Sequence, residues 1–456
     1  MNPLERDAPA IAAAVCAGTL DPVDVIDAFL AQIRRENPGI NAIVDHDELR
    51  PRAEAAALRS RIGQKALPLA GVPFVVKDSI WVQGRRITQG SPLFAEFVAP
   101  QDALPVARLR AAGAVVIGLG NMPEFGAKEI TDNRLYGRTL NPRDRSRTPG
   151  GSSGGCAAAL AADMAPLALG GDGGGSCRRP PAHVGVVGFK PSPGVVADPW
   201  GFPGTLPGIA CTCPMGRTVA DVEAVFDIIA LPHSQDVLST QAAPASGRSI
   251  ATMRTAFSAR LGLGLALDAD VRTAVERAIE RLREAGLEVR EEDPEWPPGT
   301  AEARILAIED AGLAHLFGSE LIARPDLFDP AIAVQIKRGQ RRSAADVAAA
   351  HDFSLQLASA LAGFFDRFDL LLCPTIACVA WPADQLDPAT IEGRPALHRE
   401  HAAFTPLFNH ARTPALTIPC GTGAGGLPVG LQIVGRRLAD RDVLAAGRWM
   451  ESVLAR

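Results

Sequence analysis

The sequence predicts an α/β fold in which helices cover both faces of a β-sheet. Short apolar, β-prone runs alternate with amphipathic helical patterns along the 456 residues. Hydrophobic residues make up 47% of the chain and charged ones 21%, so the chain can bury a large core around such a sheet. No internal repeat and no marked linker interrupts the alternation. We therefore predict a single domain over residues 1–456.

The N-terminal half supplies the first predicted elements. Asp21 and Pro22 are typical of a helix start, and apolar residues recur at helical spacing from Val23 to Ile33. The run over residues 71–78 is apolar and β-prone, and it ends in a charged pair. By the same reasoning we predict helices over residues 106–113 and 157–162 and strands over residues 114–118 and 184–189.

The C-terminal half contains the clearest helical pattern, over residues 270–286, whose apolar side chains fall on one face and which ends at Gly286. Residues 413–435 carry no charge and are long enough to cross a bilayer. The prolines and glycines of this segment are incompatible with a lipid-exposed span, so we predict strand, loop, strand there. Strands are predicted over residues 287–289, 370–372, 415–418 and 429–434.

The composition excludes several classes of partner. A net charge of −5 argues against nucleic acid or an anionic membrane as a partner. The eight cysteines form no CxxC pair, and Cys211 and Cys213 have no second His/Cys pair at metal spacing, so we predict free thiols and no metal site. Residues 1–10 lack the apolar stretch of a signal peptide, and we therefore expect a cytoplasmic protein.

Two glycine-rich clusters are the most informative feature of the chain. Residues 150–155 read GGSSGG, and residues 172–176 read DGGGS. Glycine lets a backbone turn its N–H groups toward a ligand, because no Cβ blocks close approach or positive φ. Each cluster also carries a hydroxyl beside those N–H groups. A nucleophile next to oxyanion donors is the arrangement that acyl transfer needs.

A serine nucleophile needs a base, and the histidines of this chain occur in no recognised triad context. His183 is near the second cluster in sequence, but Pro180 and Pro181 precede it and argue against a helix that would face it toward a serine. A lysine can act as the base if burial lowers its pKa, and Lys77 ends an apolar run where such burial is expected. The pattern Gly-x-Ser-x-Gly around Ser152 also fits the nucleophile elbow of α/β-hydrolases, but the residues before it are polar and not strand-like.

Residues 71–78, 147–155 and 170–180 resemble, in that order, the sequence motifs of the amidase signature family. The resemblance implies that Ser176 is the nucleophile, that Ser152 is a bridging serine preceded by a cis peptide, and that Lys77 is the neutral base. Supporting matches to the family occur over residues 121–125, 188–191, 217–221, 373–375 and 426–432. The resemblance further implies an oxyanion hole built from the backbone N–H groups of Gly173, Gly174, Gly175 and Ser176, and supporting roles for Ser153, Asp172 and Arg178.

The same resemblance implies a three-layer α/β/α fold with a large central mixed β-sheet. We expect the catalytic core over about residues 65–230 and a pocket-shaping region over about residues 300–410. The expected activity is hydrolysis of a small-molecule amide through an acyl-enzyme on Ser176, without metal or organic cofactor. Met122, Phe125, Leu313 and Phe317 are candidate pocket residues and favour a hydrophobic or aryl amide.

Several alternatives share these motifs. The same acyl chemistry serves a carbamate or ester hydrolase, and the same fold serves as one subunit of a glutamine-dependent amidotransferase. A catalytically silent binding protein on this fold is a further alternative. A homodimer is an expectation that comes only with the family, and we expect neither a nucleic-acid nor a membrane partner.

Overall fold

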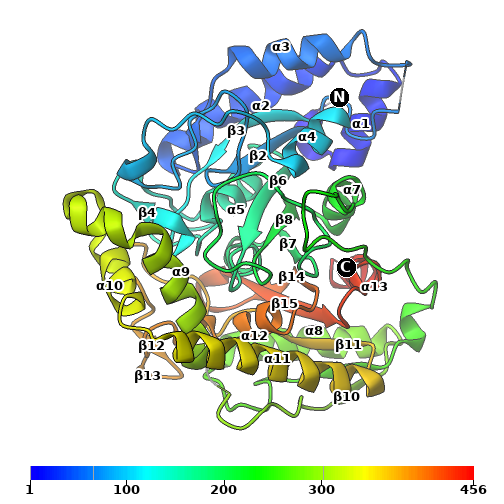
Figure 1. Ribbon diagram of the computed structural model, residues 1–456. Helices are drawn as coiled ribbons and strands as arrows, with labels where there is room; N and C mark the ends of the chain where they lie inside the picture. The colour runs from blue at the N-terminus through cyan, green and yellow to red at the C-terminus, as the bar shows by residue number, and fades with distance from the viewer. Residues whose placement is uncertain (1, 65, 301, 456) are drawn as a thin grey trace.

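One mixed sheet of eleven strands runs through the computed structural model, which describes residues 2–64, 66–300 and 302–455 (Figure 1). Neighbouring strands run parallel around β2 and antiparallel from β6 to β15. The order across the sheet is β1 (Ile43–Asp45), β3 (Val115–Gly120), β2 (Pro73–Lys77), β6 (Leu167–Asp172), β8 (Cys211–Gly216), β7 (Val187–Lys190), β14 (Ala415–Thr422), β15 (Pro428–Gly435), β11 (Leu370–Pro374), β9 (Thr255–Phe257) and β10 (Val289–Glu291). Two small hairpins lie outside it, β4 (Asp132–Asn133) with β5 (Gly137–Arg138) and β12 (Thr390–Ile391) with β13 (Arg394–Pro395).

Helices cover both faces of this sheet, which confirms the predicted three-layer α/β/α class (Figure 1). Successive strand residues point to opposite faces. A Cβ on Gly447 of α13 would meet Leu416, whereas a Cβ on Gly430 would meet Thr417 and Ala182 of α6, so α13 and α6 lie on opposite faces. The helices are α1 (Ala8–Cys16), α2 (Pro22–Glu36), α3 (Leu49–Leu58), α4 (Leu104–Ala111), α5 (Gly154–Ala161), α6 (Arg179–Val184), α7 (Val219–Ile229), α8 (Ala269–Glu284), α9 (Glu302–Ala323), α10 (Pro330–Gly339), α11 (Ala344–Arg367), α12 (Pro406–His410) and α13 (Asp440–Leu454).

Local sequence signals explain where several of these elements begin. Asp21 caps α2, because its carboxylate accepts a hydrogen bond from Val23 N at 2.8 Å, and Pro22 occupies the first turn. Thr218 and Asp221 form a reciprocal capping box at the start of α7. The predicted helices and strands are confirmed to within a few residues at α2, α4, α5, α8, β2, β3, β11, β14 and β15.

The structure corrects the prediction around residues 179–190. The predicted strand over residues 184–189 begins later, at Val187, because α6 extends to Val184. Pro180 and Pro181 do not prevent this helix, since both lie in its first turn, where no intrahelical N–H bond is required. The predicted strand over residues 287–289 is also displaced, to β10. None of the helices in the described ranges combines the length and apolar composition that crossing a bilayer requires.

Candidate active site

The predicted catalytic residues lie at one edge of the central sheet. Strands β2 and β6 are parallel neighbours, so their last residues, Lys77 and Asp172, lie at the same edge. Ser176 follows β6 in a glycine-rich turn, and Ser152 lies just before the start of α5, which packs against β2 and β6. Loops at the carboxyl ends of parallel strands are the usual place for ligand sites in α/β sheets.

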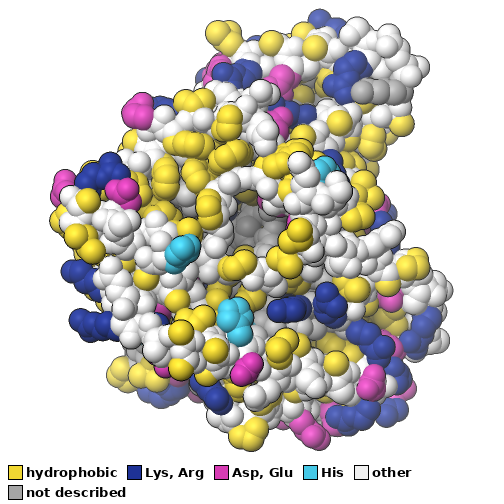
Figure 2. Space-filling view, viewed as in Figure 1, with side chains coloured by type: hydrophobic (Ala, Val, Ile, Leu, Met, Phe, Trp, Pro, Cys, Tyr) yellow, Lys and Arg dark blue, Asp and Glu magenta, His cyan; other side chains and the backbone are white. Residues whose placement is uncertain are grey.

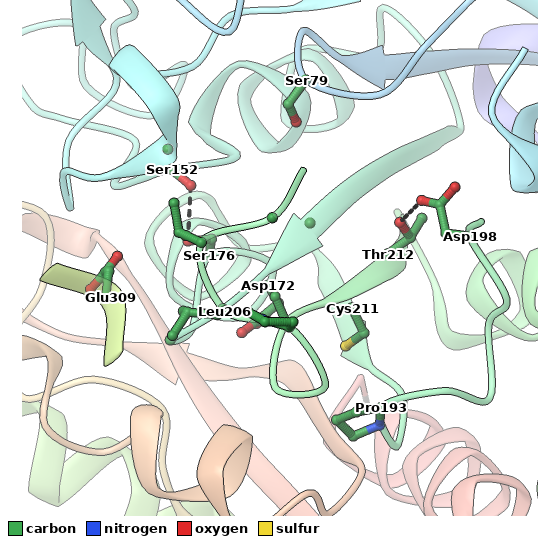
Figure 3. Close-up of a pocket in the computed structure, with 18 of the residues that line it drawn as sticks. Ser79, Ser152, Asp172, Ser176, Pro193, Asp198, Leu206, Cys211, Thr212 and Glu309 are labelled. Carbon is green, nitrogen blue, oxygen red and sulfur yellow. Dashed lines mark hydrogen bonds between the residues drawn. The ribbon is translucent and has the colours of Figure 1, made fainter. Parts of the chain in front are cut away.

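A continuous chain of hydrogen bonds joins three of the predicted residues. Lys77 Nζ donates to Ser152 Oγ at 2.7 Å, and Ser152 Oγ donates to Ser176 Oγ at 2.9 Å. Figure 3 shows the Ser152–Ser176 contact at the cavity surface. All three side chains are buried, and the Gly151–Ser152 peptide bond is cis. The arrangement connects an amine to a hydroxyl through a second hydroxyl, which is the geometry of a proton relay.

Burial lowers the pKa of the Lys77 amine. The adjacent acid, Asp78, does not offset this effect, because its carboxylate accepts hydrogen bonds from the Thr88 N–H at 2.9 Å and from the Thr88 hydroxyl. Burial raises the pKa of Asp78 itself to about 7. Among the described residues, no carboxylate forms an ion pair with Lys77. Its environment therefore favours the neutral amine.

The turn after β6 carries the predicted oxyanion donors, and Asp172 fixes its shape. Asp172 Oδ1 accepts a hydrogen bond from Gly175 N at 2.7 Å, and Oδ2 accepts one from Cys177 N at 3.1 Å. Gly175 was predicted to be an oxyanion donor, but in the structure its N–H is bonded to the Asp172 carboxylate instead. Gly173, Gly174 and Ser176 line the cavity, and no described residue accepts a hydrogen bond from their N–H groups.

Arg178 is a fully buried cation that holds Asp172 in place. Its Nε and one terminal nitrogen donate to the two carboxylate oxygens of Asp172 at 3.0 and 2.9 Å. Burial alone would raise the pKa of Asp172, but the Arg178 guanidinium outweighs it and holds this pKa well below its usual range. The remaining Arg178 donors bond to Gln432, Asn409 and the Thr405 carbonyl.

Ser153, the last of the predicted supporting residues, lies behind the relay. Its hydroxyl donates to Gly171 O at 3.3 Å and contacts Cys177 Sγ at 3.5 Å. A Cβ on Gly170 would come within 3.0 Å of that hydroxyl, so the strand and Ser153 are closely packed. Ser153 therefore supports the end of β6.

The relay opens onto a cavity of about 700 Å³ (Figures 2 and 3). One side is an aromatic wall, which we define as Met122, Phe125 and Phe317. The rings of Phe125 and Phe317 stack with centroids 3.8 Å apart, and Met122 is buried beside them. Three of the four pocket residues predicted from the sequence, Met122, Phe125 and Phe317, thus line the same cavity as Ser176. The fourth, Leu313, lies on α9 like Phe317 but is fully buried and is not among the lining residues.

A second side of the cavity is a polar wall that the sequence did not reveal, which we define as Glu129, Arg179, Glu309 and Arg399. Arg399 lies 3.0 Å from Glu129 and 3.8 Å from Glu309, and Arg179 lies 3.8 Å from Glu129. These residues come from four separate segments of the chain. No local motif connects them, so only the fold identifies them as neighbours.

Histidines and cysteines take no part in the relay. His183 is buried edge-on to Trp381, with ring centroids 5.3 Å apart, and burial lowers its pKa to about 3. All eight cysteines are free thiols, and the Sγ atoms of Cys211 and Cys213 lie 3.6 Å apart. Within residues 2–64, 66–300 and 302–455, no group of three His, Cys, Asp or Glu side chains has the arrangement of a metal site.

The fold and this site define an amide-hydrolysing enzyme of the amidase signature class. The chain belongs to the amidase family, whose model, described as Amidase, matches residues 24–444. It is 36% identical over 457 residues to an acylamidase from Rhodococcus erythropolis, covering 97% of this chain and 94% of the relative. It is 35% identical to a glutamyl-tRNA(Gln) amidotransferase component of Thermus thermophilus, covering 98% of this chain and 97% of that protein. The solved structure of a bacterial aryl acylamidase of the amidase signature family is similar, with a TM-score of 0.90, 26% identity, and coverage of 98% of this chain and 96% of the other.

Proposed function

We propose that this enzyme cleaves linear amides that have a hydrophobic or aryl half, through an acyl-enzyme on Ser176. The observation that carries the proposal is the hydrogen-bonded chain Lys77–Ser152–Ser176, 2.7 and 2.9 Å, at the surface of a cavity with an aromatic wall. The acylamidase and aryl acylamidase names of two relatives support the same substrate class.

In the acylation step Ser176 Oγ forms a bond to the amide carbonyl carbon. Its proton passes to Ser152 Oγ while the Ser152 proton passes to the lone pair of the neutral Lys77 amine. The carbonyl oxygen becomes an oxyanion, and we assign its stabilisation to the N–H groups of Gly173, Gly174 and Ser176, which line the cavity. Lys77 then returns its proton through Ser152 to the leaving nitrogen, the C–N bond breaks, and the amine departs.

In the deacylation step water is the nucleophile and Ser176 Oγ is the leaving group. A water molecule attacks the acyl carbon and gives a proton to Ser152 Oγ, while the Ser152 proton passes to the Lys77 amine. Lys77 then returns a proton through Ser152 to the departing Ser176 Oγ. The bond to Ser176 Oγ breaks, and the carboxylic acid leaves. Because the attacked carbon and the oxyanion are alike in amides, carbamates and esters, the same residues would process all three classes.

Three substitutions test the relay. Ser176→Ala should lower kcat/KM for an anilide by on the order of 10⁴-fold and abolish labelling by a fluorophosphonate probe. Lys77→Met should lower kcat/KM by about 10²- to 10⁴-fold, because the general base is lost. Lys77→Arg is the matched control, because arginine keeps the positive charge and stays protonated. If Lys77→Arg retained wild-type activity, Lys77 would serve as a fixed cation and the proposed base would be wrong.

A component of a glutamine-dependent amidotransferase is the second candidate function, and the 35% identity to such a protein favours it. The two functions predict different behaviour. The amidotransferase hypothesis requires hydrolysis of free glutamine at a rate above that of anilides, and stable co-purification with a partner. The stacked Phe125 and Phe317 instead support an apolar or aryl group next to the relay.

A further inference from the structure

Two arginines line the end of the cavity that is farthest from Lys77 across the sheet. Arg412 precedes the start of β14, and Arg437 follows the end of β15, and both line the same 700 Å³ cavity as Ser176. The strand order β6-β8-β7-β14 separates β6 from β14 by three strand spacings, or about 14 Å along the sheet edge. The aromatic wall lies toward β3 and β2, on the other side of the nucleophile.

Arg412 is half-buried and Arg437 is exposed. Within the described part of the chain, no side chain or carbonyl accepts a hydrogen bond from the guanidinium group of Arg412 or Arg437, and no carboxylate forms an ion pair with either group. Two acids, Asp198 and Asp236, also line the cavity, and the hydrogen bonds that their carboxylates accept come from neutral donors. Asp236 accepts hydrogen bonds from Asp198 N and Leu238 N, both at 3.0 Å, and Asp198 accepts one from the Thr212 hydroxyl at 2.7 Å. The two guanidinium groups are therefore available to an anionic ligand, and Figure 2 shows Lys or Arg side chains on one side of the hollow.

Arg412 also has an unusual backbone. Its φ is +60°, in the left-handed region, which residues other than glycine rarely adopt. Its N–H donates to Asn409 O at 3.0 Å, which closes the turn after α12. The turn alone does not explain why a long cationic side chain occupies a position that favours glycine. The place of Arg412 on the cavity surface gives a functional reason for an arginine there.

We propose that Arg412 and Arg437 form an anion subsite that binds a carboxylate carried by the substrate. The substrate class is then a linear amide with an apolar or aryl group on one half and a terminal carboxylate on the other, since the aromatic wall and the arginines lie on opposite sides of Ser176. Guanidinium groups bind carboxylates through paired, charge-assisted hydrogen bonds. This inference rests on the proposed amide hydrolysis at Ser176.

The test uses matched anionic and neutral substrates. One set is the succinyl, adipoyl, suberoyl and sebacoyl p-nitroanilides, each compared with its methyl ester. A reciprocal set, N-(phenylacetyl) ω-amino acids against their primary carboxamides, places the carboxylate on the amine half. The readout is the ratio of kcat/KM for the acid to kcat/KM for its neutral partner. For wild type, we expect this ratio to exceed one at the longer chain lengths of one set, and to fall as salt is added.

Variants assign the preference to the two arginines. Arg412→Gln and Arg437→Gln should each lower the ratio by about tenfold or more, mainly through KM, while kcat/KM for the neutral substrates stays within about twofold. Arg436→Gln is the matched control, because Arg436 is adjacent in sequence but bonds to Phe365 O and Asp366. It changes the net charge equally and should leave the ratio unchanged. Arg412→Gly should lose the preference like Arg412→Gln while relieving the backbone, which separates the effect from misfolding.

The outcomes separate this inference from the proposed function. If neutral anilides are cleaved and the ratio is the same in wild type and in all four variants, the anion subsite is refuted and amide hydrolysis stands. If neither set is cleaved and a fluorophosphonate does not label Ser176, the proposed function fails. Calorimetric binding of suberoyl p-nitroanilide to Ser176→Ala tests the subsite without turnover. If adding Arg412→Gln to Ser176→Ala weakens this binding tenfold, the anion subsite is supported. Equal affinity of the single and double variants overturns it.

Discussion

The buried ion pair between Asp172 and Arg178 makes a quantitative prediction. Asp172→Asn keeps the shape of the side chain but removes its negative charge, and it leaves the Arg178 guanidinium without a counter-ion in a fully buried position. It also weakens the acceptor that holds the N–H groups of Gly175 and Cys177. We therefore expect both stability and activity to fall.

The magnitude follows from burial and chain length. Removing one partner of a buried ion pair typically costs about 3–5 kcal/mol, because the remaining charge is uncompensated. The entropy of unfolding is roughly 2.1 cal/mol/K per residue, or about 1 kcal/mol/K for this chain of 456 residues. The melting temperature of Asp172→Asn should then be lower by about 3–5 °C.

Scanning calorimetry at pH 7 measures this shift, with Asp198→Asn as the matched control. Asp198 is also an acid on the cavity surface, but it is only half-buried and accepts a hydrogen bond from the Thr212 hydroxyl, and desolvation raises its pKa to about 7. Its replacement breaks no ion pair and should lower the melting temperature by less than about 1 °C. The double variant Arg178→Met/Asp172→Asn should lose less stability than the sum of the single changes, because it leaves no unpaired charge. A wild-type melting temperature for Asp172→Asn would refute the reasoning.

Two further predictions concern the turn after β6 and a buried histidine. Gly175→Ala should lower the free energy of unfolding by about 1–3 kcal/mol, because the φ of Gly175 is +127° and the new Cβ would clash with Thr405. Gly174→Ala is the control, because its Cβ meets nothing closer than 4.0 Å. Equal melting temperatures for the two variants would contradict the argument. Burial lowers the pKa of His183 from an unfolded value of 6.5 to about 3. Between these two values the unfolded chain binds a proton that the native state does not. Stability is therefore lost as pH falls from about 6.5 toward 3. Urea unfolding should show that His183→Gln removes about 2 kcal/mol of the loss between pH 8 and pH 5; an unchanged pH dependence would show that His183 does not cause it.

The sequence was sufficient to predict those parts of the candidate site that depend on local motifs. Lys77 ends a strand and the two serines lie in glycine-rich turns, and these signals made them candidates. The resemblance to the amidase signature family connected the three residues, and the structure brings them together at one sheet edge. The direction of the Gly175 N–H could not be predicted, because it depends on the Asp172 carboxylate, whose position Arg178 fixes.

The polar wall and the anion subsite were beyond the reach of sequence reasoning for a different reason. Glu129, Arg179 and Arg399 become neighbours only when segments far apart in the chain pack together. Helices α9 and α11, which belong to the pocket-shaping region, were also not predicted, since their apolar residues are not confined to one clear face. Long-range packing, and not a local sequence signal, therefore determines the polar wall, the anion subsite and these two helices.

The contacts of Arg178 have a consequence for the order in which the newly made chain becomes functional. Its guanidinium reaches Asn409 and Gln432, both far beyond the relay residues in sequence. During synthesis, Lys77, Ser152 and Ser176 emerge from the ribosome long before these acceptors. The turn that carries Ser176 therefore stays incomplete until the last strands join the sheet. We predict that a chain that stops before β15 would contain Lys77, Ser152 and Ser176 yet remain inactive.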